Sequence, residues 1–185
     1  STITVTAKDD FGNPLPGVTV AIAATGQGNT LVQPTGVTND KGVATGKFSS
    51  TSPGDHTLSA TLNGTVATQT AKVTVTAGPP VASNSTAQVG PGTSGAVTTV
   101  TVNLKDATGN SVIGAANKIS VTVSGANSAS GPVSESGGGA YSFAYTPVKV
   151  GTDFVTVRVD GVEVPGSPFS SAVSPGPADA GKSTA

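Results

Sequence analysis

The sequence predicts an all-β fold made of two tandem β-sandwiches, and three observations carry that prediction. Apolar and polar residues alternate with a period of two in many short segments. Residues that favour turns separate these segments. The two halves of the chain also repeat one another. No stretch shows the spacing of an amphipathic helix.

The alternating segments are the expected strands. Aliphatic residues occupy one face of each segment, and mainly Thr or Ser occupies the other, which is typical of a sheet with one buried and one solvated side. The segments are residues 3–6, 18–22, 72–76, 100–104, 119–123 and 154–159. Their Thr-rich faces leave the surface uncharged, and such a surface favours edge-to-edge association unless something covers it.

Turn signals separate the expected strands. Gly, Asn, Asp and Pro gather at residues 11–14, 39–42, 53–55, 63–64, 108–110 and 160–161. The sequence also places Asp9, Asp10 and Asn13 at one turn, and Asp106 and Asn110 at the matching turn of the second half. We interpret these side chains as turn caps, because the ligand spacing of a calcium-binding loop is absent.

An internal repeat divides the chain into domains. Residues 3–13 match residues 100–110, and residues 54–64 match residues 151–161, both at an offset of 97. Proline interrupts the strand pattern close to residues 77–80. The sequence therefore predicts a first domain over residues 1–77, a second over residues 78–175, and a tail over residues 176–185.

The tail resembles the opening of the second domain. Residues 176–185 match residues 78–87 at an offset of 98, so the tail is expected to be equivalent to the first strand of a following repeat. The first domain, by contrast, begins with what would be its second strand and lacks an opening one. With no initiator Met, the chain is expected to be an interior piece of a longer protein. The tail residues expected to carry assembly are Gly176, Pro177, Ala178, Ser183, Thr184 and Ala185.

The composition excludes several classes of function. Of 185 residues only 10% are charged, and the formal net charge is −1, so the chain lacks the basic surface that nucleic-acid binding requires. It has no cysteine, and its one histidine cannot form a multi-histidine zinc site. We expect that histidine, His56, to be a solvated turn residue, since no nucleophile or cleft accompanies it. We therefore expect neither an enzyme nor a cofactor or metal, and no apolar run approaches the length of a membrane span.

The second domain resembles a filamin-type immunoglobulin repeat. The segments 139–147 and 166–169, with Gly151 between them, carry the resemblance, which covers residues 81–174. On the expected strand, Tyr141, Phe143 and Tyr145 alternate and so share a core-facing side. The resemblance implies a rod-forming module of a multi-repeat protein. It does not imply actin binding, which in filamins belongs to separate helical domains.

The first domain resembles the bacterial immunoglobulin-like domains of the invasin and intimin adhesins. Segments 12–20 and 38–44 carry this similarity over residues 1–76. Together the two resemblances give the fold class as all-β, with two tandem immunoglobulin-like β-sandwiches. They imply repeat modules of a surface protein, and they imply no receptor binding, which in such adhesins lies mainly in distal domains.

Two functions fit these observations. The first hypothesis is a structural repeat unit of an extracellular fibre or surface stalk, in which the tail of one unit completes the first sandwich of the next, head to tail. The alternative is a segment of a cell-surface adhesin that binds a host protein or glycan through loops or a sheet edge. The expected partners are copies of the chain or covalently adjacent repeats, and the sequence alone does not separate these two arrangements.

Asn63 and Asn84 each begin an N-glycosylation acceptor pattern, and glycans there would cover the uncharged faces. We expect the intact mass of the protein from a glycosylating host to exceed that of the bare sequence, and Asn63→Gln to reduce the excess. Mass spectrometry that finds the bare mass would contradict the hypothesis.

Overall fold

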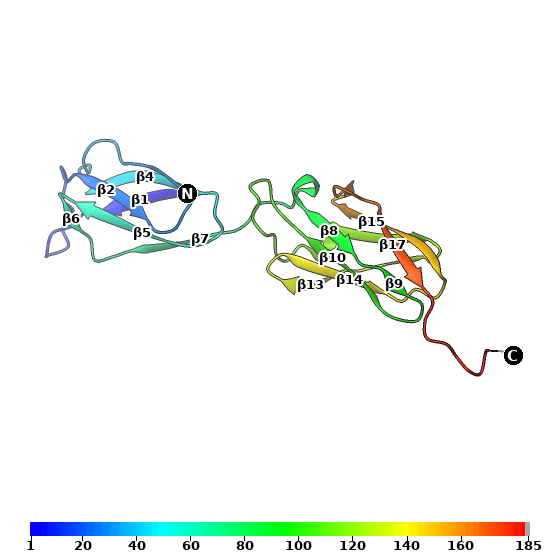
Figure 1. The fold of residues 1–185 in the computed structure, drawn as a ribbon. Coiled ribbons are helices and arrows are strands. Elements are labelled where there is room, and N and C mark those ends of the chain that lie inside the picture. Colours follow the sequence, from blue (N-terminus) through cyan, green and yellow to red (C-terminus); the bar gives the residue numbers. More distant parts are fainter. Residues whose placement is uncertain (184–185) are drawn as a thin grey trace. The chain divides into compact units, whose positions relative to one another are not determined.

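The computed structural model describes residues 1–183, and within it the chain forms two compact units, Ser1–Ala77 and Gly78–Ala185 (Figure 1). Both units are built from strands joined by turns. The only helical segments described are two single turns of 3₁₀ helix, η1 (Ala82–Asn84) and η2 (Ala116–Lys118). Within residues 1–183, therefore, no helix is long and apolar enough to cross a membrane.

The first unit is a sandwich of two antiparallel sheets. One sheet has the order β1-β4-β3, and in the other both β2 and β7 pair with β5, whose far end also pairs with the short β6. The strands are β1 (Thr2–Thr6), β2 (Val20–Ala24), β3 (Asn29–Val32), β4 (Val43–Ser50), β5 (Gly54–Leu62), β6 (Thr65–Val66) and β7 (Ala71–Val75).

The second unit repeats this plan with additional strands. One sheet has the order β13-β14-β10-β8, and the other has the order β12-β11-β15-β17-β9, with β16 on β15. The strands are β8 (Thr86–Val89), β9 (Gly92–Thr93), β10 (Thr98–Asn103), β11 (Ile119–Gly125), β12 (Ala129–Gly131), β13 (Ser134–Gly137), β14 (Ala140–Tyr145), β15 (Gly151–Val159), β16 (Val162–Glu163) and β17 (Phe169–Ser174).

The alternation seen in the sequence determines which side chains form the core. On β10 the side chains of Val100 and Val102 are fully buried, while Thr99 is exposed and Thr101 is partly exposed. On β15 Val155 and Val157 are likewise fully buried. Because successive side chains of a strand point to opposite faces, period-two alternation leaves one dry and one solvated face.

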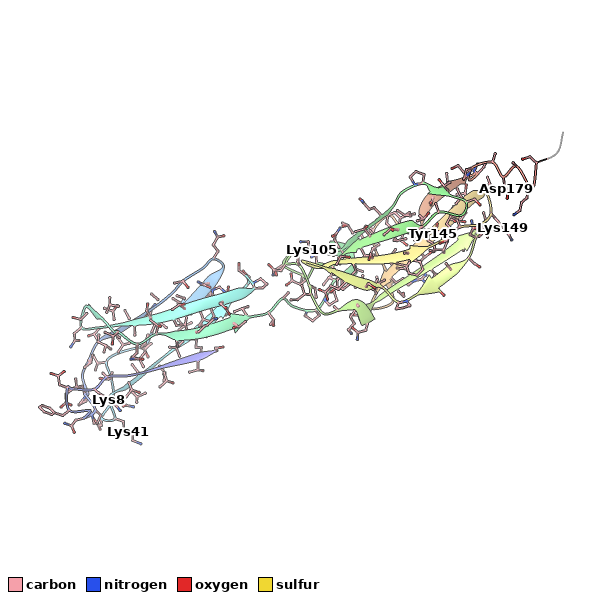
Figure 2. All side chains as sticks on the ribbon, turned by 90° about the horizontal axis from the view of Figure 1, so that it is seen from below. Lys8, Lys41, Lys105, Tyr145, Lys149 and Asp179 are labelled. Atoms are coloured by element: carbon pink, nitrogen blue, oxygen red, sulfur yellow. The ribbon has the colours of Figure 1, made fainter. Side chains whose placement is uncertain are left out.

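Aromatic side chains fill the core of the second unit, as the alternation on β14 predicts. Tyr141, Phe143 and Tyr145 are all buried, and Tyr145 lies inside the sandwich in Figure 2. The hydroxyl of Tyr141 donates to the Val112 carbonyl oxygen at 2.9 Å and accepts from the Ala115 amide at 3.0 Å. This strand therefore anchors the connection between β10 and β11 as well as filling the core.

Smaller residues occupy the corresponding positions of the first unit. Ala44, Gly46 and Phe48 stand on β4 where Tyr141, Phe143 and Tyr145 stand on β14. A Cβ on Gly46 would lie 2.6 Å from Ile22 Cδ1 of the facing sheet and 2.7 Å from the Val32 carbonyl oxygen of the neighbouring strand β3, so this position has no room for a larger residue. The core of the first unit therefore contains smaller side chains at these positions than the core of the second.

Replacing Tyr141 by Phe removes one hydroxyl that satisfies two backbone groups of buried residues. We expect the free energy of unfolding of the second unit to fall by about 1–3 kcal/mol, because the Val112 carbonyl and the Ala115 amide lose their partner. Chemical denaturation followed by circular dichroism measures the loss. The transition of the first unit is an internal control, and an unchanged midpoint for the second would contradict the prediction.

Candidate functional site

The candidate site is defined by how the second unit closes its sandwich. Its opening segment first runs along the first sheet, where β8 pairs antiparallel with β10 and places Ala87 opposite Val102 and Val89 opposite Val100. It then crosses at Gly90 and Pro91, and β9 pairs parallel with β17 in the other sheet. The opening segment thus covers an edge of both sheets.

The described residues of the first unit contain no counterpart of β8 or β9. Strand β1 pairs with β4, and β7 pairs with β5, and no strand among residues 1–77 pairs with the other edge of either. Since the backbone groups of a strand point alternately to its two sides, both edges present unpaired amides and carbonyls. We call this position the open strand site.

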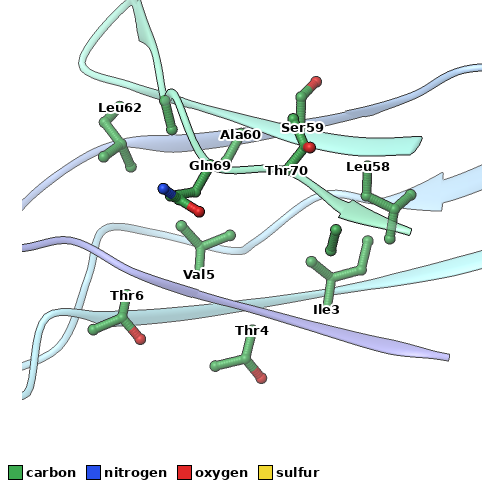
Figure 3. Close-up of a pocket in the computed structure, with 12 residues that line it drawn as sticks. Ile3, Thr4, Val5, Thr6, Leu58, Ser59, Ala60, Leu62, Gln69 and Thr70 are labelled. Atoms are coloured by element: carbon green, nitrogen blue, oxygen red, sulfur yellow. The ribbon is translucent and has the colours of Figure 1, made fainter. Parts of the chain in front are cut away.

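A groove of about 220 Å³ lies at the open strand site (Figure 3). Ile3 and Val5 point from β1 toward the opposite sheet, whereas Thr4 and Thr6 point away. Leu58 and Leu62 of β5 line the other wall of the groove. The complete lining is Ile3, Thr4, Val5, Thr6, Leu58, Ser59, Ala60, Leu62, Ala67, Gln69, Thr70 and Ala71. None of these side chains is charged, so the groove offers apolar contact and backbone hydrogen bonds rather than ionic ones.

The open strand site also leaves core residues of the first unit half-exposed. Ile3 and Val5 are only partly buried, while their counterparts Val100 and Val102 are 0% exposed. Leu62 is likewise half-buried, whereas its counterpart Val159 is 1% exposed. An added strand would therefore bury apolar surface and pair backbone groups in one step.

In each unit an aspartate side chain caps a turn: Asp9 in the turn that follows β1, and Asp106 in the turn that follows β10. Asp106 Oδ1 accepts from the amides of Thr108 and Asn110, both at 2.9 Å, and its Oδ2 accepts from Asn110 Nδ2 at 2.9 Å. Asp9 makes the corresponding contacts with Phe11 and Asn13. Both carboxylates act as turn caps, which is the role that the sequence predicts.

The two caps differ in one contact that concerns the opening segment. Asp106 Oδ2 also accepts from the Gly78 amide at 3.0 Å, and Asp106 is 3% exposed, whereas Asp9 is half-exposed and receives no such bond within residues 1–183. The hydrogen bond from the Asn110 side chain, with those from the backbone of Asn110 and Gly78, holds the pKa of Asp106 well below its usual range. The Asn13 side chain lowers the pKa of Asp9 in the same way.

The tail adopts the local structure of the segment that precedes β8. The amide of Lys182 donates to the Asp179 carbonyl at 3.1 Å, just as that of Asn84 donates to the Val81 carbonyl at 3.1 Å. The Ser183 hydroxyl donates to the Asp179 carbonyl at 2.8 Å, as the Ser85 hydroxyl does to the Val81 carbonyl at 2.9 Å. Residues 176–183 thus match the turn that precedes β8 in the second unit.

The other tail residues that the sequence predicts to carry assembly lie near the end of β17 or beyond the described residues. Gly176 lies against Ser94, where a Cβ would approach the Ser94 carbonyl oxygen to 2.6 Å, and Pro177 and Ala178 are exposed. Thr184 and Ala185 lie outside the described residues. No tail residue among 176–183 is in a strand.

The two glycosylation candidates occupy different environments. Asn63 is exposed in the turn between β5 and β6. Its Oδ1 accepts from the Thr19 amide at 2.9 Å, and this bond engages the side-chain oxygen rather than the nitrogen that would carry a glycan. Asn84 is also exposed, but its Nδ2, the atom that would carry a glycan, donates to the Asp106 carbonyl at 2.9 Å. The geometry favours Asn63 over Asn84, and modification of either stays a prediction.

The prediction that His56 is a solvated turn residue is wrong. His56 lies within β5 and is 3% exposed, with Nδ1 2.9 Å from the Thr25 carbonyl oxygen and Nε2 3.0 Å from that of Ser52. Its ring packs on Phe48. The signal was present in the sequence, because His56, Leu58, Ala60 and Leu62 alternate with a period of two and share the inward face.

The sequence interpretation also missed the buried acid of the second unit. Asp153, the counterpart of His56, is 0% exposed, accepts from the Asn127 amide at 2.7 Å and receives the Tyr145 hydroxyl at 3.1 Å. Burial raises the pKa of Tyr145. Both inward polar side chains tie a loop to the start of a strand. Among the described residues no group of three or more His, Cys, Asp or Glu side chains is placed to hold a metal ion.

Two family models match the chain, one for each unit. Residues 1–78 match the bacterial Ig-like domain (group 1), and residues 79–170 match the filamin/ABP280 repeat. No match to a curated protein was found.

Solved structures of bacterial surface proteins are similar to this chain. FdeC, a broadly conserved Escherichia coli adhesin, is 29% identical over 94% of this chain and 59% of that one, with a TM-score of 0.62. Invasin, a bacterial integrin-binding protein, is 27% identical over 97% of this chain and 37% of that one, with a TM-score of 0.51. InvD of Yersinia pseudotuberculosis shares the fold, at 23% identity and a TM-score of 0.74, over all of this chain and 55% of that one. The chain thus spans 37–59% of the length of these structures.

The two acidic caps predict a specific dependence of stability on pH. A lowered pKa in the folded state means that the carboxylate stabilises the fold above the ordinary Asp pKa of about 4 and loses this effect as the pH falls through that value and below it. Asp106→Asn should therefore lower the melting temperature of the second unit at pH 7, and the difference should shrink at pH 2.5. Asp9→Asn should behave alike in the first unit with a smaller effect. Scanning calorimetry at both pH values checks this, and a difference that does not change with pH would contradict it.

Proposed function

We propose that this chain, a tandem of one bacterial Ig-like domain and one filamin-type repeat, is a stalk segment of a bacterial surface adhesin, and that such segments join head to tail. The observation that carries the proposal is the open strand site of the first repeat, which no strand among residues 1–77 fills, together with a tail whose sequence matches the segment that fills the same position in the second repeat.

The stalk role is supported by what the chain presents to solvent. Its strands expose Thr and Ser, only 10% of its residues are charged, and its inward polar groups serve turns and loops rather than a reactive centre. Similar tandem domains occur in FdeC, an adhesin, and in invasin, an integrin-binding protein. Location at the cell surface belongs to the same proposal.

The second repeat supplies a template for the joint between two copies. There Gly78 donates to the Asp106 carboxylate, the Val81 amide donates to the Lys105 carbonyl at 2.8 Å, and the Lys105 amide donates to the Ser85 hydroxyl at 3.1 Å. By repeat equivalence, the tail of one copy would make these bonds with the first repeat of the next. Gly176 would bind the Asp9 carboxylate, and Asp179 and Ser183 would bind the backbone of Lys8.

The same template gives the register of the added strand. Thr86 stands opposite Asn103, and Ala87 stands opposite Val102. Thr184 would therefore stand opposite Thr6 of the next copy, and Ala185 opposite Val5. In this register the tail covers the Val5 end of the groove, where Leu62 lines the facing wall.

Engineered cysteines test the register, because the chain has none of its own. A Thr6→Cys chain mixed with a Thr184→Cys chain in an oxidising glutathione buffer should form a disulfide-linked heterodimer, since residues paired across strands are about 5.5 Å apart between Cα atoms. Electrophoresis without reductant measures the yield.

Thr2→Cys is the matched control. Thr2 and Thr6 are both exposed threonines on the same face of β1, about 13 Å apart along the strand. The Thr2→Cys chain should give little heterodimer, and deletion of residues 176–185 from the Thr6→Cys chain, which leaves the groove intact, should not reduce the yield. Equal yields from Thr2→Cys and Thr6→Cys, or no heterodimer, would overturn head-to-tail joining.

A further inference from the structure

We infer that Phe11 anchors a second contact at the joint between copies, by packing on an exposed valine cluster at the tail end of the preceding copy. The inference rests on the proposed head-to-tail joining and identifies the partner surface as a second copy of this chain. It concerns side chains outside the open strand site.

The valine cluster consists of Val97, Val148 and Val150. Their exposed fractions are 68%, 71% and 57%, so none of them serves the core of the second repeat. The two loops that carry them are held together, because the Ser94 hydroxyl donates to the Val148 carbonyl at 2.9 Å and the Gly95 amide donates to the Pro147 carbonyl at 2.8 Å. The valines therefore lie on two loops that are fixed against each other.

The tail leaves the second repeat beside this cluster. The Ser94 amide donates to the Ser174 carbonyl at 2.9 Å, and Gly176 lies against the Ser94 carbonyl. Figure 2 likewise shows Lys149 of the 147–150 loop and Asp179 of the tail at the same end of this repeat. Anything that binds the first residues of the tail is thus brought close to the valines.

Phe11 stands at the tip of the turn that Asp9 caps. The Phe11 amide donates to Asp9 Oδ1 at 2.9 Å, and its side chain is 91% exposed, so it contributes nothing to the core of the first repeat. The second repeat has Thr108 at this position, whose hydroxyl donates back to the Asp106 carboxylate at 2.8 Å. The turn itself therefore does not require an aromatic residue.

The reach of the tail brings the two surfaces together. Gly176 touches Ser94 in its own copy and, in the joint derived from the second repeat, donates to Asp9 of the next. Only one residue then separates the Ser94 loop from the Asp9 turn, so Phe11 lies within contact range of Val97 and Val148. Burying an aromatic ring against aliphatic side chains is favourable, and such residues dominate the energy of many interfaces.

Charges at the two ends are complementary. Lys149 and Lys182 lie at or beyond the valine cluster, and Asp10 is exposed next to Phe11. Lys182 also corresponds to Asn84, whose side chain donates to the backbone of the acidic turn in the second repeat. The joint therefore brings Lys182 toward Asp9 and Asp10, which favours this partner and orientation over others.

A tryptophan in place of Phe11 tests the contact, because the chain contains no other. The fluorescence of Phe11→Trp should shift to shorter wavelength when an unlabelled copy with an intact tail is added, and should not shift with a copy that lacks residues 176–185. Val32→Trp is the control. Val32 is an exposed apolar residue, and the β3–β4–β1 register places it level with Thr2, at the far end of β1 from Asp9.

A double-mutant cycle measures how much the contact between Phe11 and Val148 contributes to formation of the Thr6→Cys and Thr184→Cys heterodimer. Phe11→Thr in the first chain, or Val148→Thr in the second, should raise the concentration needed for half-maximal heterodimer by roughly tenfold. The two together should have less than the product of their separate effects, since they remove one contact.

The outcomes separate the two proposals. If no heterodimer forms without these substitutions, head-to-tail joining fails and this inference fails with it. If the heterodimer forms but Phe11→Thr and Val148→Thr leave its concentration dependence unchanged, or if the emission of the Phe11→Trp chain does not shift, the joint holds and only the contact of Phe11 with the valines is overturned.

Discussion

Closure of each sandwich by its opening strand is the constraint on which the rest of this structure depends. Where β8 is present, the valines of β10 are fully buried and the acidic turn beside them is tied to Gly78. Where no such strand is described, Ile3 and Val5 stay half-exposed and Asp9 lacks its extra partner. One strand thus governs both the burial of the core and the satisfaction of a sheet edge.

The two repeats differ in how large a core they bury without the added strand. The second repeat buries three aromatic residues on β14, and its inward polar groups, Asp106 and Asp153, are fully hydrogen-bonded. The first repeat packs Ala44 and Gly46 at two of those positions and keeps a smaller core. A sandwich with a small buried core and an open strand site gains proportionately more from an added strand, since less of its apolar surface is already buried.

The surface chemistry of the chain suits a segment that joins other segments. Uncharged Thr-rich strands neither repel a neighbouring copy nor attract polyanions. For such surfaces to associate specifically, other contacts must select one sheet edge and one strand register. The tail, with its turn of Asp179–Ser183, and the acidic turn at Asp9 have the local geometry for that selection, because the second repeat already holds the same two elements in contact.

The sequence by itself determined the all-β class, the positions of most strands and the aromatic face of β14, because side-chain alternation and turn chemistry are local properties of the chain. It also indicated the repeat and the caps at Asp9 and Asp106. Only the tertiary structure decided which loops His56 and Asp153 hold in place, that Asp106 accepts from the Gly78 amide, and that the residues lining the groove come from β1, β5 and residues 67–71. Those facts depend on which segments distant in sequence pack together, and no local pattern contains that information.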